Sequence, residues 1–551
     1  MNKLVLFLII FLAFFLRFWH LSSTPTSLSH DEVAIGYNAW SILQTGKDEY
    51  GISYPILFRS FDDYKLPGYI YSTAISEKIF GLNEFAVRFP SAVLGVLTVI
   101  ATYLLVRVFF LSRGITQNGT RNNAEMMALL SSFLLAINPW HINFSRAAFE
   151  TNGSLFFLIL GVYLLFLGIR KPWFFILSSI SFIISIYFYY TVRILIPVVI
   201  TAFIFSYRWE LLKVKKYLAL SLLLGIFLLI PLLSQMFSNG LSRVNQVSIF
   251  EDKSLTNPYS QAILRNSDSL LAKVFYNRRL AYLQEFSDNY FKNFAPDFFF
   301  VNGTGSMGLL YLWEAPFFFF GIYQIIKLKK KWKWVILAWF FGVPIVGGLT
   351  TGQPNALRTL PNVITAELFT AFGLFSVVNL LKKKYVPYFL LVMIGVIGFF
   401  FIRFMFLYFD YQANLSASNW GDGHKQMVQL VKENKIKYDS IYVTGDYWRP
   451  YIYTLFYANY NPSLYQKTGS RYNINNIYFG PDSWNREGET DFAKADLSKL
   501  SKAKTLFLLS FRDFKSQKNL IEEKKVPYKF TKVKQIDGNF VKGAFYAVEL
   551  F

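Results

Sequence analysis

The sequence contains no cysteine in 551 residues, and only 16% of its residues are charged. Without cysteine, the chain has no disulfide, no catalytic thiol and no thiolate metal site. A soluble domain normally contains about 25% charged residues, so the low charge content argues against a soluble protein. The net charge is +22, but the basic residues lie between hydrophobic segments instead of on one folded face. This distribution reflects membrane topology and does not indicate a nucleic-acid partner.

Hydrophobic residues make up 54% of the chain and aromatic residues 19%. Runs of about 20 apolar residues, the length that crosses about 30 Å of hydrocarbon, recur along the sequence. Eleven apolar segments are predicted as spans, at residues 4–21, 88–111, 125–140, 150–169, 173–190, 194–207, 218–237, 309–327, 334–350, 361–381 and 386–409. The first is expected to stay uncleaved, since it is longer than a signal-peptide core and no A-x-A site follows. The sequence therefore predicts a polytopic α-helical membrane protein with about 11 transmembrane helices.

The positions of Lys and Arg in the loops predict the orientation in the plasma membrane. Basic residues cluster at 113–121, 170–171, 208–216, 327–333 and 382–384. All of these clusters fall on the cytoplasmic side if the N-terminus is cytoplasmic. Residues 1–410 are then a transmembrane domain with large outer loops at 22–87 and 238–307. Residues 411–551 are predicted to lie outside the cell membrane as an extracytoplasmic domain.

The tail has the patterns of a mixed domain. Residues 440–446 and 505–511 have the composition of buried strands, and residues 424–435 have the periodicity of an amphipathic helix. These patterns predict a C-terminal α/β domain.

Several ionisable residues lie within the apolar segments, namely Arg17, Arg146, Glu150, Arg193, Arg358, Glu367 and Arg403. On the predicted topology they lie toward the outer ends of their spans, whereas an ion pathway would place charges through the midplane. This indicates a site at the outer leaflet, and arginine is suited to binding phosphate. Two alternatives remain open. Arginine near a helix end can snorkel to the headgroups, and Arg146 and Glu150, four residues apart, can form an intrahelical ion pair.

The first outer loop holds the best candidate for a catalytic carboxylate. HDEVAIGYNAW (30–40) places Asp31 and Glu32 soon after the first apolar segment. Removing a proton from an acceptor hydroxyl while a lipid-linked phosphate leaves requires a carboxylate base. Asp31 is predicted to be this base, and Glu32 either orients the acceptor or pairs with a basic neighbour. The alternative is that Asp31, or Ser29, only caps a juxtamembrane helix.

A second stretch of the same loop, SFDDYKLPGY (60–69), contains Asp62, Asp63 and Lys65. Lys65 is predicted to bind the phosphate together with Arg146 or Arg193, because a Lys or Arg clamp stabilises a leaving phosphate. The two aspartates can equally belong to a solvated turn.

Six motifs occur in a characteristic order: HDEVAIGYNAW (30–40), DYKLP (63–67), GLNEFAVRFPSA (81–92), NFSRAAFE (143–150), YYTVRILIP (189–197) and NALRTLPNV (355–363). In this order they resemble the GT-C superfamily of membrane glycosyltransferases, of the dolichyl-phosphate-mannose-protein mannosyltransferase and lipid A aminoarabinose transferase type. The resemblance is good up to about residue 200, looser to residue 410 and faint in the tail.

The resemblance implies an inverting transferase whose sugar donor is a polyprenyl phosphate, made on the cytoplasmic face and flipped outward. It implies that Asp31 matches the catalytic carboxylate position of the family and that Lys65 and Arg146 match positions that contact the donor phosphate. Arg193 and Arg358 lie in two further family-like motifs and are predicted to contact the same phosphate.

The chain departs from this family at one position. Relatives usually have an acid directly before the lysine, where this chain has Tyr64, with Asp63 one place earlier. Asp63, Tyr64 and Glu150 are therefore assigned only to the acceptor or to a supporting role.

The expected partners are a polyprenyl-phosphate-linked sugar, membrane lipids, and an acceptor that is a protein, a lipid or a glycan. The tail has no MIR-type repeat, so that route gives no support for a protein acceptor. No cofactor is expected, because the WWDYG-like signature of metal-dependent relatives is missing; a divalent metal is the less favoured alternative.

Two other functions are weighed against the transferase. A transporter or flippase of a lipid-linked precursor would also place arginines near phosphates, but the odd number of spans and the lack of an internal repeat argue against it. The inner halves of the spans are also nearly all Leu, Ile, Phe and Val. A membrane-anchored binding protein that works through its tail would leave eleven spans unexplained.

Overall fold

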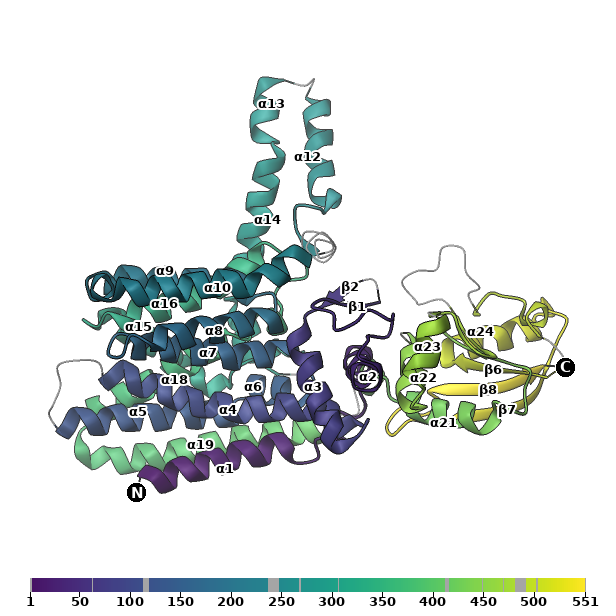
Figure 1. The fold of residues 1–551 in the computed structure, drawn as a ribbon, viewed down its shortest axis with the longest axis horizontal. Coiled ribbons are helices and arrows are strands. Elements are labelled where there is room, and N and C mark those ends of the chain that lie inside the picture. Colours follow the sequence, from purple (N-terminus) through teal and green to yellow (C-terminus); the bar gives the residue numbers. More distant parts are fainter. Residues whose placement is uncertain are drawn as a thin grey trace. The chain divides into compact units, whose positions relative to one another are not determined.

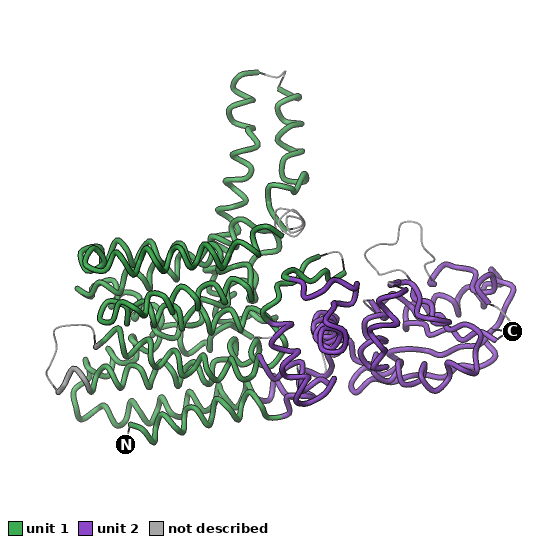
Figure 2. The backbone as a smooth tube through the Cα atoms, viewed as in Figure 1, with its two compact units in different colours: residues 1–19, 56–68, 91–404 green, residues 20–55, 69–90, 405–551 purple. Residues whose placement is uncertain are grey.

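The computed structural model describes residues 2–61, 63–111, 118–235, 247–266, 269–305, 307–411, 416–447, 449–468, 470–480, 492–501 and 504–550. The chain forms two compact units (Figure 1 and Figure 2). Unit 1 consists of residues 1–19, 56–68 and 91–404, and unit 2 of residues 20–55, 69–90 and 405–551. The sequence predicted a single domain boundary at residue 410. In the structure, residues 20–55 and 69–90, which include most of the first outer loop, belong to the same unit as the tail.

Unit 1 is a bundle of apolar helices. These are α1 (Asn2–Phe18), most of α4 (Glu84–Leu111), α5 (Asn118–Ile137), α7 (Glu150–Gly168), α8 (Phe174–Phe188), α9 (Val192–Leu211), α10 (Lys215–Gln235), α15 (Ala315–Lys327), α16 (Trp332–Gly348), α18 (Asn362–Leu380) and α19 (Val386–Phe406). Each of the eleven predicted apolar segments overlaps one of these helices. Helices satisfy all backbone hydrogen bonds internally, which a chain inside hydrocarbon requires.

Among the residues that the structure describes, five helical segments are long and apolar enough to cross a membrane: Glu84–Phe110, Glu150–Gly168, Val192–Gln235, Asn362–Leu380 and Lys383–Tyr411. The third of them contains both α9 and α10. Large apolar side chains are exposed along α10 and α19, as with Phe227 (67%) and Ile394 (69%), which is the surface expected to face lipid. The total of eleven spans stays a prediction.

Within the described residues, unit 1 also contains two strands and five further α-helices. They are the strands β1 (Phe58–Ser60) and β2 (Asp63–Lys65), which form an antiparallel hairpin, and the helices α6 (Pro139–Arg146), α12 (Lys253–Arg265), α13 (Leu270–Phe275), α14 (Arg278–Lys292) and α17 (Ala356–Thr359). Helices α12, α13 and α14 form a helical hairpin that extends from the bundle transversely to its helices (Figure 1).

Unit 2 contains α2 (His30–Thr45), nearly all of α3 (Pro67–Phe80) and a six-stranded sheet. The sheet order is β4-β5-β3-β6-β8-β7. Its strands are β3 (Ser440–Val443), β4 (Asn473–Ile474), β5 (Ile477–Phe479), β6 (Thr505–Ser510), β7 (Phe530–Ile536) and β8 (Phe545–Leu550), and its helices are α21 (His424–Asn434), α22 (Pro450–Tyr457), α23 (Pro462–Thr468) and α24 (Phe511–Glu522).

The centre of this sheet is parallel and its edges are antiparallel. Strand β3 pairs in parallel with β5 and β6, and β8 pairs antiparallel with β6 and β7. All six residues of β6 are buried, as expected for a central strand covered on both faces. Strands β3 and β6 and helix α21 coincide with the strand and helix patterns of the tail sequence.

Candidate active site

Asp31 lies in the first turn of α2, in unit 2. Ser29 is the N-cap of this helix: its Oγ accepts a hydrogen bond from the backbone N–H of Glu32 (3.3 Å), and the Glu32 carboxylate accepts one from the backbone N–H of Ser29 (3.0 Å). The N-cap of this helix is therefore Ser29 and not Asp31. The Asp31 side chain is 54% exposed, with Oδ2 3.8 Å from His30 Nε2. Asp31 therefore presents an accessible carboxylate at the positive end of a helix.

Glu32 has a different environment from its neighbour. Arg88, in the first turns of α4, donates from Nε to Oε1 (2.9 Å) and from Nη2 to Oε2 (3.1 Å) of Glu32. Arg88 also donates to the carbonyl oxygens of Leu21 (3.2 Å), Pro25 (2.8 Å) and Ser27. Both charged side chains are buried. Glu32 thus pairs with a basic neighbour, Arg88, which is one of its two predicted roles. This pair holds the loop that leads to Asp31.

Side chains from the tail hold the same loop and helix. The Tyr453 hydroxyl donates to the Leu28 carbonyl (3.2 Å), and the Tyr457 hydroxyl lies 3.4 Å from Ser27 Oγ. Gln466 Nε2 donates to Ser41 Oγ (3.1 Å), Thr45 Oγ1 (2.9 Å) and the Asp48 carbonyl (3.0 Å). The sequence did not predict these contacts. The aromatic run PYIYTLFY (450–457) is the local signal for them, and it does not show which residues it contacts. The tail is thus part of the unit that positions Asp31.

His424 packs against the ring of Tyr453. The two rings are stacked with their centroids 3.9 Å apart, and His424 Nδ1 lies 2.9 Å from the Gly421 carbonyl oxygen. Burial lowers the pKa of His424 to about 4, because a buried imidazolium has lost the water that would stabilise its charge. The ring is therefore neutral at neutral pH.

Lys65 lies at the end of the β1–β2 hairpin, in unit 1, and its Nζ is 3.5 Å from Glu150 Oε1. Tyr190 donates from its hydroxyl to the Tyr64 carbonyl (2.8 Å), and Asp63 Oδ1 accepts from the Tyr64 N–H (2.7 Å). The carboxylate beside Lys65 therefore comes from the start of α7 instead of from position 64. Asp62 lies outside the described residues.

Arg193 and Arg358 line one cavity of unit 1, with a volume of about 340 Å³. Arg193 lies over the ring of Tyr190, with its Cζ 4.4 Å from the ring centroid. Arg358 donates from Nη1 to Thr350 Oγ1 (2.9 Å) and to the Thr351 carbonyl (2.7 Å). The structure thus brings together two of the four cations predicted to bind phosphate, in a pocket whose other walls are mostly apolar and aromatic.

Arg193 also lines a second, larger cavity of about 600 Å³ between α8, α9 and α10. Apart from Arg193 and three serines, this groove is lined by apolar residues such as Phe182, Ile200 and Leu229. A pocket with two guanidinium groups therefore adjoins an apolar groove through one shared arginine. An amphipathic ligand with an anionic head and a hydrocarbon tail matches this arrangement.

Arg146 is placed differently from these arginines. It is fully buried and donates to the carbonyl oxygens of Leu16 (2.7 Å) and Trp19 (2.6 Å). Arg146 ends α6, and Glu150 begins α7 after an extended break at 147–149. The premise that Arg146 and Glu150 share one helical face is therefore wrong, because the backbone between them is not helical. The carbonyl contacts favour a structural role for Arg146.

Two other buried ionisable residues of the apolar helices also serve packing. Arg17 donates to the Ala13 and Ala136 carbonyls (3.1 and 3.2 Å) and lies 2.6 Å from His141 Nδ1. Glu367 Oε1 accepts from Asn138 Nδ2 (2.5 Å). Buried charges without such partners would be very unfavourable in hydrocarbon.

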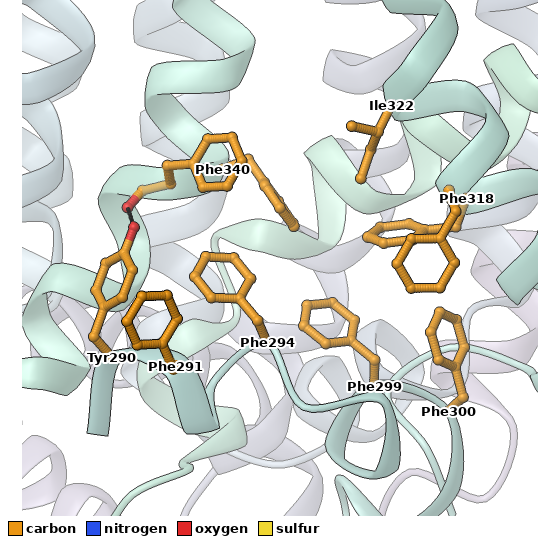
Figure 3. Close-up of a pocket in the computed structure, with 10 residues that line it drawn as sticks. Tyr290, Phe291, Phe294, Phe299, Phe300, Phe318, Ile322 and Phe340 are labelled. Atoms are coloured by element: carbon orange, nitrogen blue, oxygen red, sulfur yellow. Dashed lines mark hydrogen bonds between the residues drawn. The ribbon is translucent and has the colours of Figure 1, made fainter. Parts of the chain in front are cut away.

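A third cavity of unit 1 carries no charge. It has a volume of about 530 Å³ and is lined by eight phenylalanines, Tyr290 and Ile322 (Figure 3). Its residues come from α14, from Phe294 just after it, from α15 and α16, and from the π-helical turn Phe298–Asn302. Over the part of the chain that the structure describes, no group of three or more His, Asp and Glu residues has an arrangement that could hold a metal ion.

Comparison with known proteins supports the resemblance seen in the motifs. Residues 65–234 match the family described as dolichyl-phosphate-mannose-protein mannosyltransferase. A protein of Aquifex aeolicus (strain VF5), described as uncharacterized, is 32% identical over 157 residues, which are 28% of this chain and 29% of that protein.

Solved structures extend the comparison to nearly the whole chain. ArnT from Cupriavidus metallidurans in the apo state is 12% identical, with a TM-score of 0.55 and coverage of 98% of this chain and 97% of ArnT. ArnT bound to undecaprenyl phosphate is 11% identical, with the same coverage and TM-score. The oligosaccharyltransferase AglB from Archaeoglobus fulgidus, in complex with an inhibitory peptide and a dolichol-phosphate, is 14% identical, with a TM-score of 0.50. The match to AglB covers 83% of this chain and 63% of AglB.

At these identities the matches show a shared fold. The chain has the GT-C membrane fold that its motifs predicted, and it is a multi-pass membrane protein.

Proposed function

We propose that this protein is a membrane glycosyltransferase that moves a sugar from a polyprenyl phosphate to an acceptor hydroxyl. The observation that carries the proposal is Arg193, which lines both the cavity containing Arg358 and the apolar groove of α8, α9 and α10. The phosphate of the donor binds the two guanidinium groups, and the isoprenoid chain lies in the groove. ArnT, which shares the fold, has been solved with undecaprenyl phosphate.

The reaction is a direct displacement at the anomeric carbon. The acceptor oxygen forms a bond to this carbon while the bond from the carbon to the phosphate oxygen breaks. The acceptor proton goes to the Asp31 carboxylate, and the electron pair leaves with the phosphate. The leaving group is already an anion, so cations stabilise it and no strong general acid is needed. One displacement inverts the configuration of the sugar.

Other residues have supporting roles in this proposal. Lys65, paired with Glu150, provides a further cation for the phosphate, while Asp63 and Tyr64 shape the hairpin that carries Lys65. Arg88 and Glu32 act through the loop and position Asp31. Arg146 is assigned to the packing of α6 against α1, on account of its carbonyl contacts. The phosphate contacts come from the protein, so we propose that transfer continues in the presence of EDTA.

The N-terminus is proposed to be cytoplasmic, with the donor used at the opposite face of the plasma membrane. The cysteine-free sequence allows a direct test. A membrane-impermeant maleimide added to intact cells should label Lys432→Cys of unit 2 and leave Lys383→Cys, in the predicted cytoplasmic cluster, unlabelled. The reverse pattern would overturn the orientation.

The test of the activity uses purified protein in nanodiscs and a panel of radiolabelled polyprenyl-phosphate sugars. Sugar release to water or to a membrane extract is measured for the natural protein, Asp31→Asn and the exposed control Asp439→Asn. The proposal expects release by the natural protein and the control and loss of release in Asp31→Asn. Donor binding without release, unchanged in Asp31→Asn, would favour a flippase instead.

A second pair of variants tests the donor site on one helix. Arg193→Gln, at the cavity, should raise the donor concentration needed for half-maximal release, whereas Arg208→Gln, exposed near the other end of α9, should leave it unchanged. Equal effects of the two variants would contradict the assignment of Arg193 to the phosphate.

A further inference from the structure

The helical hairpin of α12, α13 and α14 has no place in the mechanism above. Its base is tied to the end of α16: Ile249 N–H donates to the Leu349 carbonyl (3.3 Å), and Thr351 N–H donates to the Val247 carbonyl (2.8 Å). This is the end of α16 opposite the lysine-rich turn 327–333. From there the hairpin extends beyond the bundle, transversely to the apolar helices (Figure 1). If these helices cross the bilayer, the hairpin runs along its surface.

The hairpin has large apolar side chains that are mostly exposed. Leu270 is 80% exposed, Leu271 69% and Phe275 68%. On α14, Leu280, Leu283 and Phe291 are also exposed, and their spacing of three and eight residues places them on one helical face. Exposed apolar surface of this kind marks a contact with a membrane or a protein partner, or an aggregation hazard.

The exposed face of α14 leads into the uncharged cavity. Phe291 belongs to both, and Phe294 follows it at the cavity wall. The Tyr290 hydroxyl donates to the Phe341 carbonyl (3.0 Å), which holds this part of α14 against α16 (Figure 3). An elongated surface of leucines and phenylalanines thus ends in a pocket of about 530 Å³ without a charged lining residue. A hydrocarbon chain fits such a pocket, whereas a polar ligand would find few partners there.

Basic residues accompany the apolar face. From residue 253 to residue 292 the sequence has six Lys or Arg and three Asp or Glu. Arg265, Lys273, Arg278 and Arg279, near the tip, are exposed. Long basic side chains beside an apolar face are typical of helices that lie in a membrane interface, because their charged ends reach the headgroup phosphates.

We propose that this hairpin lies in the headgroup region of the membrane leaflet at the end of α16, with its apolar face against lipid chains. A lipid acyl chain occupies the phenylalanine cavity, and the basic residues near the tip contact anionic headgroups. The hairpin enlarges the membrane contact of the protein beyond its helix bundle. This inference does not depend on the transferase activity.

The absence of native cysteine allows the depth of single sites to be measured without background. Spin labels are placed at Leu271→Cys, Phe275→Cys and Leu283→Cys in protein reconstituted into nanodiscs with anionic phospholipid. Ile394→Cys on α19 is the lipid reference and Lys432→Cys on α21 the water reference. All five positions are exposed, so the labels should not disturb the fold. Power saturation with oxygen and with a water-soluble nickel complex reports the surroundings of each label.

The three hairpin labels should resemble Ile394→Cys, with more access to oxygen than to nickel. Saturation like that of Lys432→Cys would show a hairpin in water and overturn the proposal. Shielding from both reagents would show a protein partner or a second copy of the chain, and would overturn it equally. Replacing both Arg278 and Arg279 by Gln should reduce the oxygen-to-nickel ratio at Leu271→Cys, and an unchanged ratio would refute the headgroup contact.

The cavity is tested with two tryptophan substitutions on α15. Ile322→Trp adds volume inside the cavity, whereas Ile326→Trp, one turn further along, lies at an exposed position outside its lining. After purification in mild detergent, the phospholipid retained per protein is counted. Ile322→Trp should retain one lipid fewer than Ile326→Trp and the natural protein. Equal retention would overturn the assignment of the cavity to a lipid chain.

Discussion

The buried pair of Arg88 and Glu32 makes a quantitative prediction about the loop before Asp31. Arg88→Met keeps an apolar stem of similar length but removes every donor. The Glu32 carboxylate then keeps its bond from the Ser29 N–H but loses both guanidinium contacts. Removing one partner of a buried ion pair costs about 3–5 kcal/mol, because the other charge is left without compensation.

This loss should appear as faster opening of the segment. When exchange reports local opening, 3–5 kcal/mol corresponds to roughly a hundred- to several-thousand-fold faster hydrogen exchange. The assay is hydrogen exchange with mass spectrometry on peptides that cover the loop and the first turns of α2, with the protein in nanodiscs. Peptides from β6, in the centre of the sheet, serve as the internal reference.

Lys425→Gln is the matched control for Arg88→Met. Lys425 Nζ lies 2.7 Å from Glu84 Oε1 in the same unit, but the lysine side chain is 58% exposed. An exposed pair contributes only about 0–1 kcal/mol, since solvent screens it. Protection of the loop should therefore be nearly unchanged in this control. If the two variants accelerated exchange in the loop equally, burial of the Arg88–Glu32 pair would not be what holds it.

Three further predictions concern single side chains. The pKa of His424 is lowered by burial to about 4, so between about pH 6.5 and 4 the unfolded chain binds a proton that the folded chain does not. The contribution of His424 to the free energy of unfolding should be fully present above pH 6.5 and should fall by about 3 kcal/mol as the pH drops to 4. Denaturation curves of a His424→Gln variant should lack this pH dependence. Gly36→Ala places a Cβ 2.6 Å from the Phe456 ring, so overpacking should lower the free energy of unfolding by about 1–3 kcal/mol and speed hydrogen exchange in α2. The control Gly395→Ala, whose Cβ has nothing within 4 Å, should not destabilise the protein. Lys65→Ala should weaken use of the donor more than use of the acceptor in initial-rate measurements, and equal effects on both would count against a phosphate contact.

Local sequence patterns were sufficient where structure depends on neighbouring residues. The apolar segments coincide with helices because about 20 apolar residues can be buried in lipid only with their backbone bonds satisfied. Ser29 followed by Glu32 is a capping box that can be read directly from the sequence, and TLFLLSF has the unbroken apolar composition of a central strand.

The sequence could not show which distant residues meet. Lys65 pairs with Glu150 and Glu32 with Arg88, across 85 and 56 residues, and no periodicity encodes such pairings. The break between Arg146 and Glu150 was missed because neither glycine nor proline marks 147–149. The inclusion of 20–55 in unit 2 depends on Tyr453, Tyr457 and Gln466, whose partners lie more than 400 residues away.

That long connection has a consequence for how the protein is made. Helix α2, which carries Asp31, leaves the ribosome early, whereas α22 and α23, which pack on it, are synthesised about 400 residues later. At about 5–20 residues per second, this interval lasts roughly 20–80 s. During that time the buried face of α2 has none of its final partners from the tail. The contacts of the tail with the loop and helix that carry Asp31 therefore form only when translation is nearly complete, so a prematurely terminated chain would insert its helices without these contacts.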